Sequence, residues 1–164
     1  MTKRSNYITT EGASRLREEL RFLWKKERVE VTKRVSDAAK EGDRSENAEY
    51  IYSKKRLREI DRRIRYLTKR LEAIQVVTQL PSNQQKIYFG AWVTIIDEEQ
   101  RTQRYRIVGT DEFDSQTNYI SIDSPMASCL LGKSIDDEFE LRLPKKIQYW
   151  TIVKIEYFSL SANN

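Results

Sequence analysis

The chain has 164 residues, 34% of them charged, with 30 Lys and Arg against 25 Asp and Glu, no His and one Cys. Without His there is no imidazole base, Ser-His or Cys-His nucleophile pair, or His-ligated zinc, which excludes most hydrolase and metalloprotein classes. A single cysteine, Cys129, cannot form an internal disulfide and predicts a reducing compartment. Because we find neither a signal-peptide core nor an apolar run of about 18 residues, we expect a cytoplasmic protein without a membrane partner.

Charge divides the chain into two regions. Residues 1–80 hold 21 basic and 13 acidic residues, whereas residues 81–164 hold 9 and 12. The first proline, Pro81, lies in a polar stretch that is typical of a linker. The sequence therefore predicts an N-terminal domain over 1–77, a linker over 78–86 and a C-terminal domain over 87–164.

The first expected element is a long helix that begins near Thr9 or Thr10, either of which can cap it, with Glu11 in its first turn. Its apolar residues recur at helical spacing, and the stripe that they form changes register along the way. These residues are Leu16, Leu20, Leu23, Trp24, Val31, Val35 and Ala38.

A second helix carries apolar residues at strictly alternating steps of three and four, which places them on one side of the helix. We call this set the hairpin seam: Leu57, Ile60, Ile64, Leu67, Leu71 and Ile74. Gly42 is the strong helix breaker between the two helical segments. The pattern predicts an antiparallel coiled-coil hairpin whose helices have about 30 residues and a length of about 45 Å each.

After the linker, the apolar period changes to two, as in β-strands. Five strands are expected, over 87–96, 104–108, 119–122, 139–143 and 149–158. Ser124 and Pro125 have the types expected at the start of a helix, and Gly132 can end it. The predicted fold class is α+β: a helical hairpin followed by a curved antiparallel sheet that packs on one short helix.

Two carboxylates, Asp43 and Glu46, lie three residues apart where the second helix is expected to begin. Two such groups at the end of an arm can supply oxygen ligands to Mg²⁺, which usually takes one or two protein carboxylates together with water and phosphate oxygens. The same spacing also fits a capping box, in which Asp43 would cap the second helix and Glu46 would reach back to it. The two interpretations do not exclude each other.

The segment from Lys54 to Arg70 contains nine basic residues and only two acidic ones. Lys55, Arg62 and Lys69 are expected to point directly away from the hairpin seam, and Arg58 and Arg65 lie beside them. We call these five residues the basic stripe. A stripe of one sign attracts a phosphate backbone, although an ordinary solvated helix face is the alternative. Three further arginines lie closer to the seam and could pair with acids of the first helix, such as Glu18, Glu27 or Glu30: Arg56, Arg63 and Arg70.

The segment from Gly42 to Tyr50 resembles the hairpin tip of the bacterial Gre transcript cleavage factors. Segments 90–93, 106–109 and 120–127 are similar to the C-terminal signatures of the same family, so that the resemblance covers nearly the whole chain. Arg44, the basic second helix and Met126 are more similar to the GreB branch than to the GreA branch.

The resemblance implies a monomer that is not itself an enzyme. Such factors bind backtracked RNA polymerase, insert the coiled coil through its secondary channel and stimulate cleavage of the RNA 3′ end. Asp43 and Glu46 would then hold a catalytic Mg²⁺ jointly with the polymerase, with no metal bound by the free protein, and the basic stripe would contact the RNA.

The C-terminal domain would have a fold similar to FKBP prolyl isomerases and would dock on the largest catalytic subunit. The residues expected to dock are Asp123, Ser124, Pro125 and Met126. Family members often carry a basic residue shortly after this segment, where this chain has Ser128. Two alternatives stay open: a channel-binding regulator without cleavage stimulation, and a C-terminal domain that isomerises proline itself.

Overall fold

The computed structural model describes residues 4–158 and forms two compact units. One unit is Ala13–Ile74, and the other joins the described residues up to Gly12 to those from Gln75 onward. The contacts thus group the N-terminal segment with the C-terminal half of the chain. The sequence predicted a different division, with domains over 1–77 and 87–164 and a linker over 78–86. Whether those ranges fold independently stays a prediction.

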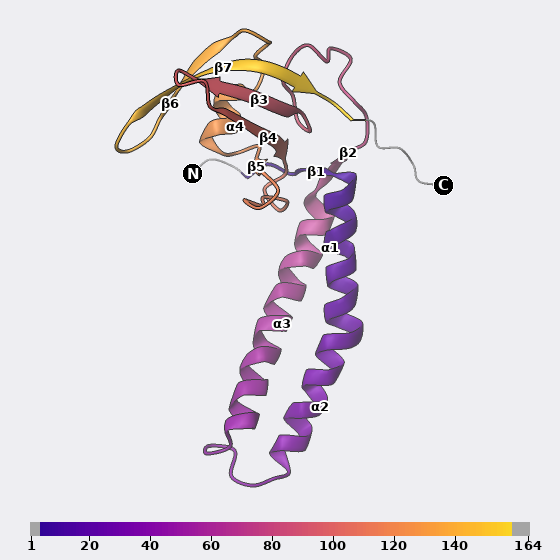
Figure 1. The fold of residues 1–164 in the computed structure, drawn as a ribbon. Helices are drawn as coiled ribbons and strands as arrows, with labels where there is room; N and C mark the ends of the chain where they lie inside the picture. The colour runs from indigo at the N-terminus through magenta and orange to yellow at the C-terminus, as the bar shows by residue number, and fades with distance from the viewer. Residues whose placement is uncertain (1–3, 159–164) are drawn as a thin grey trace. The chain divides into compact units, whose positions relative to one another are not determined.

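The helical unit is a hairpin in which α3 (Ala48–Ala73) packs along α2 (Arg28–Ala39), as Figure 1 shows. The first arm of the hairpin is α1 (Thr10–Phe22), a π-helical turn η1 (Leu23–Glu27) and α2 in succession. The Gly12 N–H donates to Thr9 Oγ1 at 3.1 Å, so Thr9 caps α1. The predicted hairpin and the predicted cap are both confirmed.

The π-helical turn corrects the spacing of the apolar stripe in the first arm. Buried residues follow one another at Leu16, Leu23, Val31 and Ala38, with one longer step across the turn. A π turn accommodates one extra residue, which returns the apolar side to the partner helix. Trp24, which the sequence placed on the stripe, is instead 57% exposed and lies 5.5 Å below the Arg28 guanidinium.

The second arm buries the predicted seam. Ile60 and Leu67 are almost completely buried, and Ser53 continues the same seven-residue step toward the tip. The other seam residues are half-buried at the margins of the contact. The two helices are therefore held by a narrow strip, as a 3.5-residue repeat requires.

The other unit contains a five-stranded sheet with the strand order β5-β4-β3-β7-β6. The strands are β3 (Trp92–Asp97), β4 (Thr102–Val108), β5 (Tyr119–Ser121), β6 (Glu138–Arg142) and β7 (Ile147–Glu156). Pairs β3–β4, β3–β7 and β6–β7 are antiparallel, whereas β4 and β5 are parallel, so the sheet is not antiparallel throughout. The first strand is shorter than predicted because residues 87–91 form a turn region before it.

The short helix α4 (Pro125–Leu130) covers the core of this unit, as predicted. The Ala127 N–H donates to Ser124 Oγ at 3.2 Å, and Pro125 occupies the first turn. Ala127 and Leu130 pack with the buried side chains of the sheet, which include Val93, Ile95, Ile107, Trp150 and Ile152. Cys129 is half-buried against this core.

Two short strands precede and follow the hairpin in sequence. β1 (Tyr7–Thr9) pairs in parallel with β2 (Gln75–Val77), with Ile8 opposite Val76. The sequence did not predict this pair, since neither segment is long enough to show a period of two. No helix in the described part of the chain is both long and apolar enough to span a bilayer.

Leu67→Ala tests the seam. Removing this fully buried side chain should lower the free energy of unfolding of the hairpin by about 2–5 kcal/mol, since a cavity adds to the lost transfer energy. Urea unfolding followed by helical circular dichroism measures it. Lys69→Ala, an exposed change on the same helix, should cost less than about 0.5 kcal/mol, and equal losses in both variants would contradict the assigned seam.

Candidate functional site

The tip of the hairpin is the segment 40–47, a tight turn built around Asp43. The Ser45 N–H donates to Asp43 Oδ1 at 2.9 Å, and the Ser45 hydroxyl donates to the same oxygen at 2.8 Å. The Glu46 N–H donates to the Asp43 carbonyl at 3.3 Å, which places both acidic residues in one turn. Gly42, with a φ of 139°, provides the reversal that most side chains would resist.

Asn47 caps the second helix, and the capping-box interpretation of Asp43 and Glu46 is wrong. The Tyr50 N–H donates to Asn47 Oδ1 at 3.1 Å, as expected of a cap three residues ahead. The Asn47 side-chain amide also donates to the Ala38 carbonyl at 2.7 Å, which ties the start of α3 to the end of α2. Asp43 and Glu46 therefore lie before α3 and do not hold its first turn.

Both tip carboxylates are exposed and suited to a divalent cation. Ser45 lowers the pKa of Asp43 below its ordinary value, first through its N–H and then through its hydroxyl. Both bonds fall on Oδ1, so Oδ2 stays open to a further ligand. Mg²⁺ usually takes one or two carboxylates from a protein, and a Mg²⁺ ion held by Asp43 and Glu46 stays a prediction.

An aromatic ring beside the tip is flanked by two cations. The Arg44 guanidinium lies 5.7 Å and the Lys54 ammonium 5.5 Å from the centre of the Tyr50 ring. A hydrogen bond with Lys54 is the main cause that lowers the pKa of Tyr50. The sequence analysis missed this cluster, although Tyr50 and Lys54 are four residues apart on one helix face, which is the signal that could have shown it.

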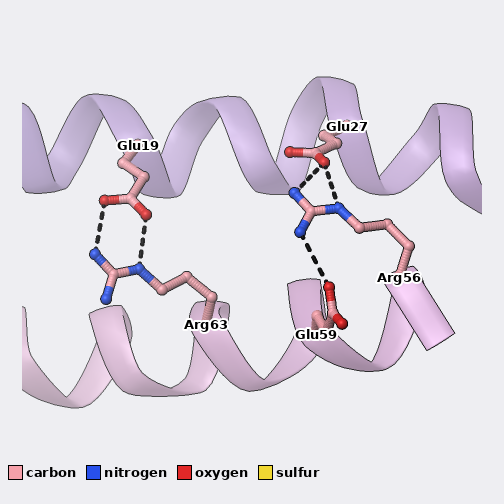
Figure 2. A network of polar contacts seen from close by, with 5 residues as sticks. All are labelled: Glu19, Glu27, Arg56, Glu59 and Arg63. Carbon is pink, nitrogen blue, oxygen red and sulfur yellow. Dashed lines mark hydrogen bonds and ion pairs between the residues drawn. The ribbon is translucent and has the colours of Figure 1, made fainter.

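Arginines next to the seam pair with acids across the hairpin (Figure 2). Arg63 forms a two-bond pair with Glu19, at 2.7 and 2.9 Å. Arg56 binds Glu27 and also contacts Glu59 on its own helix at 3.3 Å. The predicted pairing with Glu27 is confirmed for Arg56. Arg63 pairs with Glu19, an acid that was not among those named from the sequence.

The basic stripe differs from these paired arginines. Lys55, Arg58, Arg62, Arg65 and Lys69 are all exposed. Within residues 4–158, none of the five forms an ion pair, while Asp61, one of the two acids nearby, is bound by Arg28 at 2.8 Å. The stripe keeps its charge available to an external anion.

The predicted docking residues lie in the other unit, around the start of α4. Ser124 is the helix cap, Met126 packs beside the core, and Pro125 is exposed. The Ser5 N–H donates to Asp123 Oδ2 at 2.9 Å. Each residue thus has a structural position, and their docking role stays a prediction.

Family comparisons agree with the hairpin and the sheet unit. Residues 6–76 match a family described as "Transcription elongation factor, N-terminal", and residues 81–157 match "Transcription elongation factor, GreA/GreB, C-term". These matches define a two-part transcription elongation factor. The chain belongs to the GreA/GreB family.

Curated relatives support the GreB branch. Transcription elongation factor GreB of Pasteurella multocida is 57% identical over 94% of this chain and 98% of its own length. GreB of Pseudomonas aeruginosa is also 57% identical, over 92% of this chain and 89% of its own. A solved structure, GreA factor homolog 1 (Gfh1) of Thermus thermophilus, is 24% identical over 93% of this chain and 99% of its own, with a TM-score of 0.42. The predicted family and branch are confirmed.

Ser45→Ala tests the arrangement at the tip. Loss of the hydroxyl donor should raise the pKa of Asp43, but not to its ordinary value, because the backbone N–H is the larger cause and remains. Since the folded-state pKa is depressed, the stabilisation is present above the unfolded-state pKa and is lost as pH falls through the folded-state value. Carboxyl-carbon NMR against pH measures this. Ser36→Ala, a change at an exposed position of α2, is the control and should leave the titration of Asp43 unchanged.

Proposed function

We propose that this chain binds backtracked bacterial RNA polymerase and stimulates cleavage of the RNA 3′ end by the polymerase. The hairpin enters the secondary channel and brings Asp43 and Glu46 to the catalytic centre. The chain is not an enzyme by itself, because its two carboxylates complete a site that another protein provides. Membership of the GreA/GreB transcription elongation factors supports this function.

The turn at Asp43 carries the proposal. It holds an ionised carboxylate at the end of a helical hairpin, fixed by Ser45 on one oxygen and open on the other. Since Asn47 caps α3, neither Asp43 nor Glu46 is needed to accept the free N–H groups of its first turn. A tip built this way can offer both carboxylates to a ligand outside the chain.

Each part of the tip has a role in the proposed chemistry. Mg²⁺, when bound between tip and polymerase, would supply charge neutralisation and a water of lowered pKa for phosphodiester hydrolysis. Asp43 would bind the cation through Oδ2 while Ser45 orients its other oxygen. Glu46 would offer the second carboxylate from the same turn. No imidazole is required for this division of roles, which agrees with a chain that has no His.

The basic stripe would hold the extruded RNA. Its five side chains follow one face of α3, so they can meet successive phosphates of a strand that lies along the helix. The other unit would dock on the largest catalytic subunit through Asp123, Ser124, Pro125 and Met126. We propose a monomer in the bacterial cytoplasm when the chain is free.

Asp43→Asn tests the metal role. Asparagine keeps an oxygen that accepts both Ser45 bonds, so folding should change little, while loss of the anionic ligand should reduce stimulated cleavage by about 100-fold or more at limiting Mg²⁺. RNA cleavage in purified backtracked complexes measures it. Glu41→Gln, which removes a neighbouring exposed carboxylate, should retain cleavage. Full cleavage by Asp43→Asn at limiting Mg²⁺ would contradict the metal role of Asp43.

Charge reversal tests the basic stripe. The triple variant Arg58→Glu, Arg62→Glu and Arg65→Glu should keep the hairpin folded, because none of the three lies on the seam. Cleavage should fall by about tenfold or more in deeply backtracked complexes, whose long extruded RNA presents many phosphates. In complexes that are backtracked by only two nucleotides, the same variant should reduce cleavage much less.

A matched triple variant on the first arm controls for net charge. This control reverses the same number of exposed charges on α1, through Arg15→Glu, Arg17→Glu and Arg21→Glu. It should reduce cleavage only weakly, and by the same factor at both backtrack lengths. Added salt should reproduce the length dependence in the unmutated protein. Equal losses at both lengths in the stripe variant would instead assign the stripe to general attraction toward the polymerase.

A further inference from the structure

Trp24 is an exposed aromatic residue in the π-helical turn of the first arm. The preceding residue, Leu23, is buried in the contact between the two arms, whereas 57% of Trp24 is exposed. The Arg28 guanidinium lies 5.5 Å from the centre of the Trp24 ring, about one turn further along the arm. Within the residues that the structure describes, the indole N–H of Trp24 has no hydrogen-bond acceptor. An aromatic surface and a donor are therefore both open to a ligand.

Arg28 can hold the ring of Trp24 because it is itself fixed across the hairpin. Its Nε donates to Asp61 Oδ1 on α3 at 2.8 Å. A guanidinium can stack on an aromatic ring while it binds a carboxylate, so this pair orients the ring before any ligand arrives. Such pre-orientation lowers the entropy that binding costs.

Phe22 is an exposed aromatic residue of the same arm without this support. Half of Phe22 is exposed, and Lys26 lies 6.0 Å from the centre of its ring. Within residues 4–158, Lys26 forms no ion pair across the hairpin, in contrast to Arg28. Since residues two apart do not share a helix face, Phe22 and Trp24 point to different sides of the arm. Phe22 is therefore a matched control for Trp24.

The pair of Arg28 and Asp61 places Trp24 beside the basic stripe. Asp61 comes three residues after Arg58 and four before Arg65, so these three residues share one side of α3. The two arms of a hairpin run antiparallel, so four residues back from Arg28 is level with four residues forward from Asp61. Those two positions are Trp24 and Arg65. Because packed helices have axes only about 8–10 Å apart, one strand can contact both the ring and the stripe.

The two margins of the hairpin differ in how their charges are paired. On one margin, arginines of α3 bind carboxylates of the first arm, as Figure 2 shows. On the margin of Trp24 the pairing is reversed, since Arg28 of the first arm neutralises Asp61 of α3. Asp61 is the acid that lies among the stripe residues, so its neutralisation preserves the positive charge of the stripe for a phosphate backbone.

We propose that Trp24 stacks on an unpaired base of a single-stranded RNA whose phosphates bind the basic stripe, an inference that rests on the proposed RNA contact of that stripe. An aromatic side chain beside a positively charged surface is how proteins bind single strands without reading their sequence. The phosphate contacts give the salt-dependent part of the affinity, and the stacked base gives a part that salt changes little. The ligand is a single strand, because the bases of a duplex are already stacked on one another.

Binding of RNA to the free full-length chain tests the proposal. The probe is a fluorescein-labelled single-stranded RNA of about 12 nucleotides, followed by fluorescence anisotropy at low salt. Trp24→Ala should weaken binding by about tenfold or more, without changing the slope of log Kd against log salt concentration. Trp24→Leu, which stays apolar but loses the ring, should behave like Trp24→Ala, whereas Trp24→Tyr should retain most of the affinity. Phe22→Ala should bind like the unmutated chain.

An abasic strand of the same length separates stacking from phosphate binding. The unmutated chain should bind this strand about as weakly as Trp24→Ala binds the RNA, and Trp24→Ala should not weaken binding of the abasic strand further. Because Trp24 lies outside the buried strip, its variants should keep the hairpin folded, as helical circular dichroism can verify. If Trp24→Ala does not fold, the comparison of Trp24→Leu with Trp24→Tyr decides.

Four results would overturn the proposal. These are unchanged RNA affinity in Trp24→Ala, an equal loss toward the abasic strand, absence of RNA binding by the unmutated chain at low salt, and loss of stimulated cleavage in Trp24→Ala with unchanged RNA affinity. The last result would assign the ring to a protein surface of the polymerase.

The stripe variant distinguishes this proposal from the proposed function. The triple change of Arg58, Arg62 and Arg65 to Glu should weaken binding of both strands and reduce the salt slope. An unchanged slope in that variant would refute the RNA contact of the stripe, whereas the Trp24 variants test the stacked base. Failure of the unmutated chain to stimulate cleavage would refute the proposed function, and the binding measurement needs no polymerase.

Discussion

Burial of one narrow apolar strip is the constraint on which the hairpin depends. Ile60 and Leu67 are buried at a seven-residue spacing, and the opposite arm buries Leu23 and Val31. The flanking ion pairs are half-exposed, and such pairs contribute at most about 1 kcal/mol each. They therefore align the two helices, while the strip holds them together. Because so small a part of α3 is needed for stability, the rest of its surface is available for charge.

The division of charge on α3 follows from this geometry. Arginines beside the strip meet carboxylates across the hairpin, and Figure 2 shows two of them, Arg56 and Arg63, on the same side. Basic residues opposite the strip face solvent, where the other helix has no carboxylate to offer. The same residue type thus has a structural role at one helix angle and stays available for a ligand at another.

Elements with a repeating pattern could be predicted from the sequence, and single contacts could not. The seam, the five strands and α4 each repeat an apolar period or end in recognisable capping residues, and all are found. The π-helical turn was visible only as a change of register, because a single extra residue has no pattern of its own. The buried hydrogen bond from the Thr9 N–H to the Glu112 carboxylate has no local signal at all, since the two residues are 103 residues apart in the chain.

The tip shows why the candidate site could be found although its local structure was predicted wrongly. Asp43 and Glu46 have the spacing of a capping box, yet Asn47, one residue before α3, already satisfies the free N–H of Tyr50. An N-cap contributes about 1 kcal/mol, which either residue could supply, so spacing alone does not choose between them. With the cap on Asn47, the Asp43 side chain is held by Ser45, and neither tip carboxylate holds the first turn of α3. The candidate site at the tip and the stability of the helical arm thereby depend on different residues, so the tip carboxylates can change without loss of the helix cap.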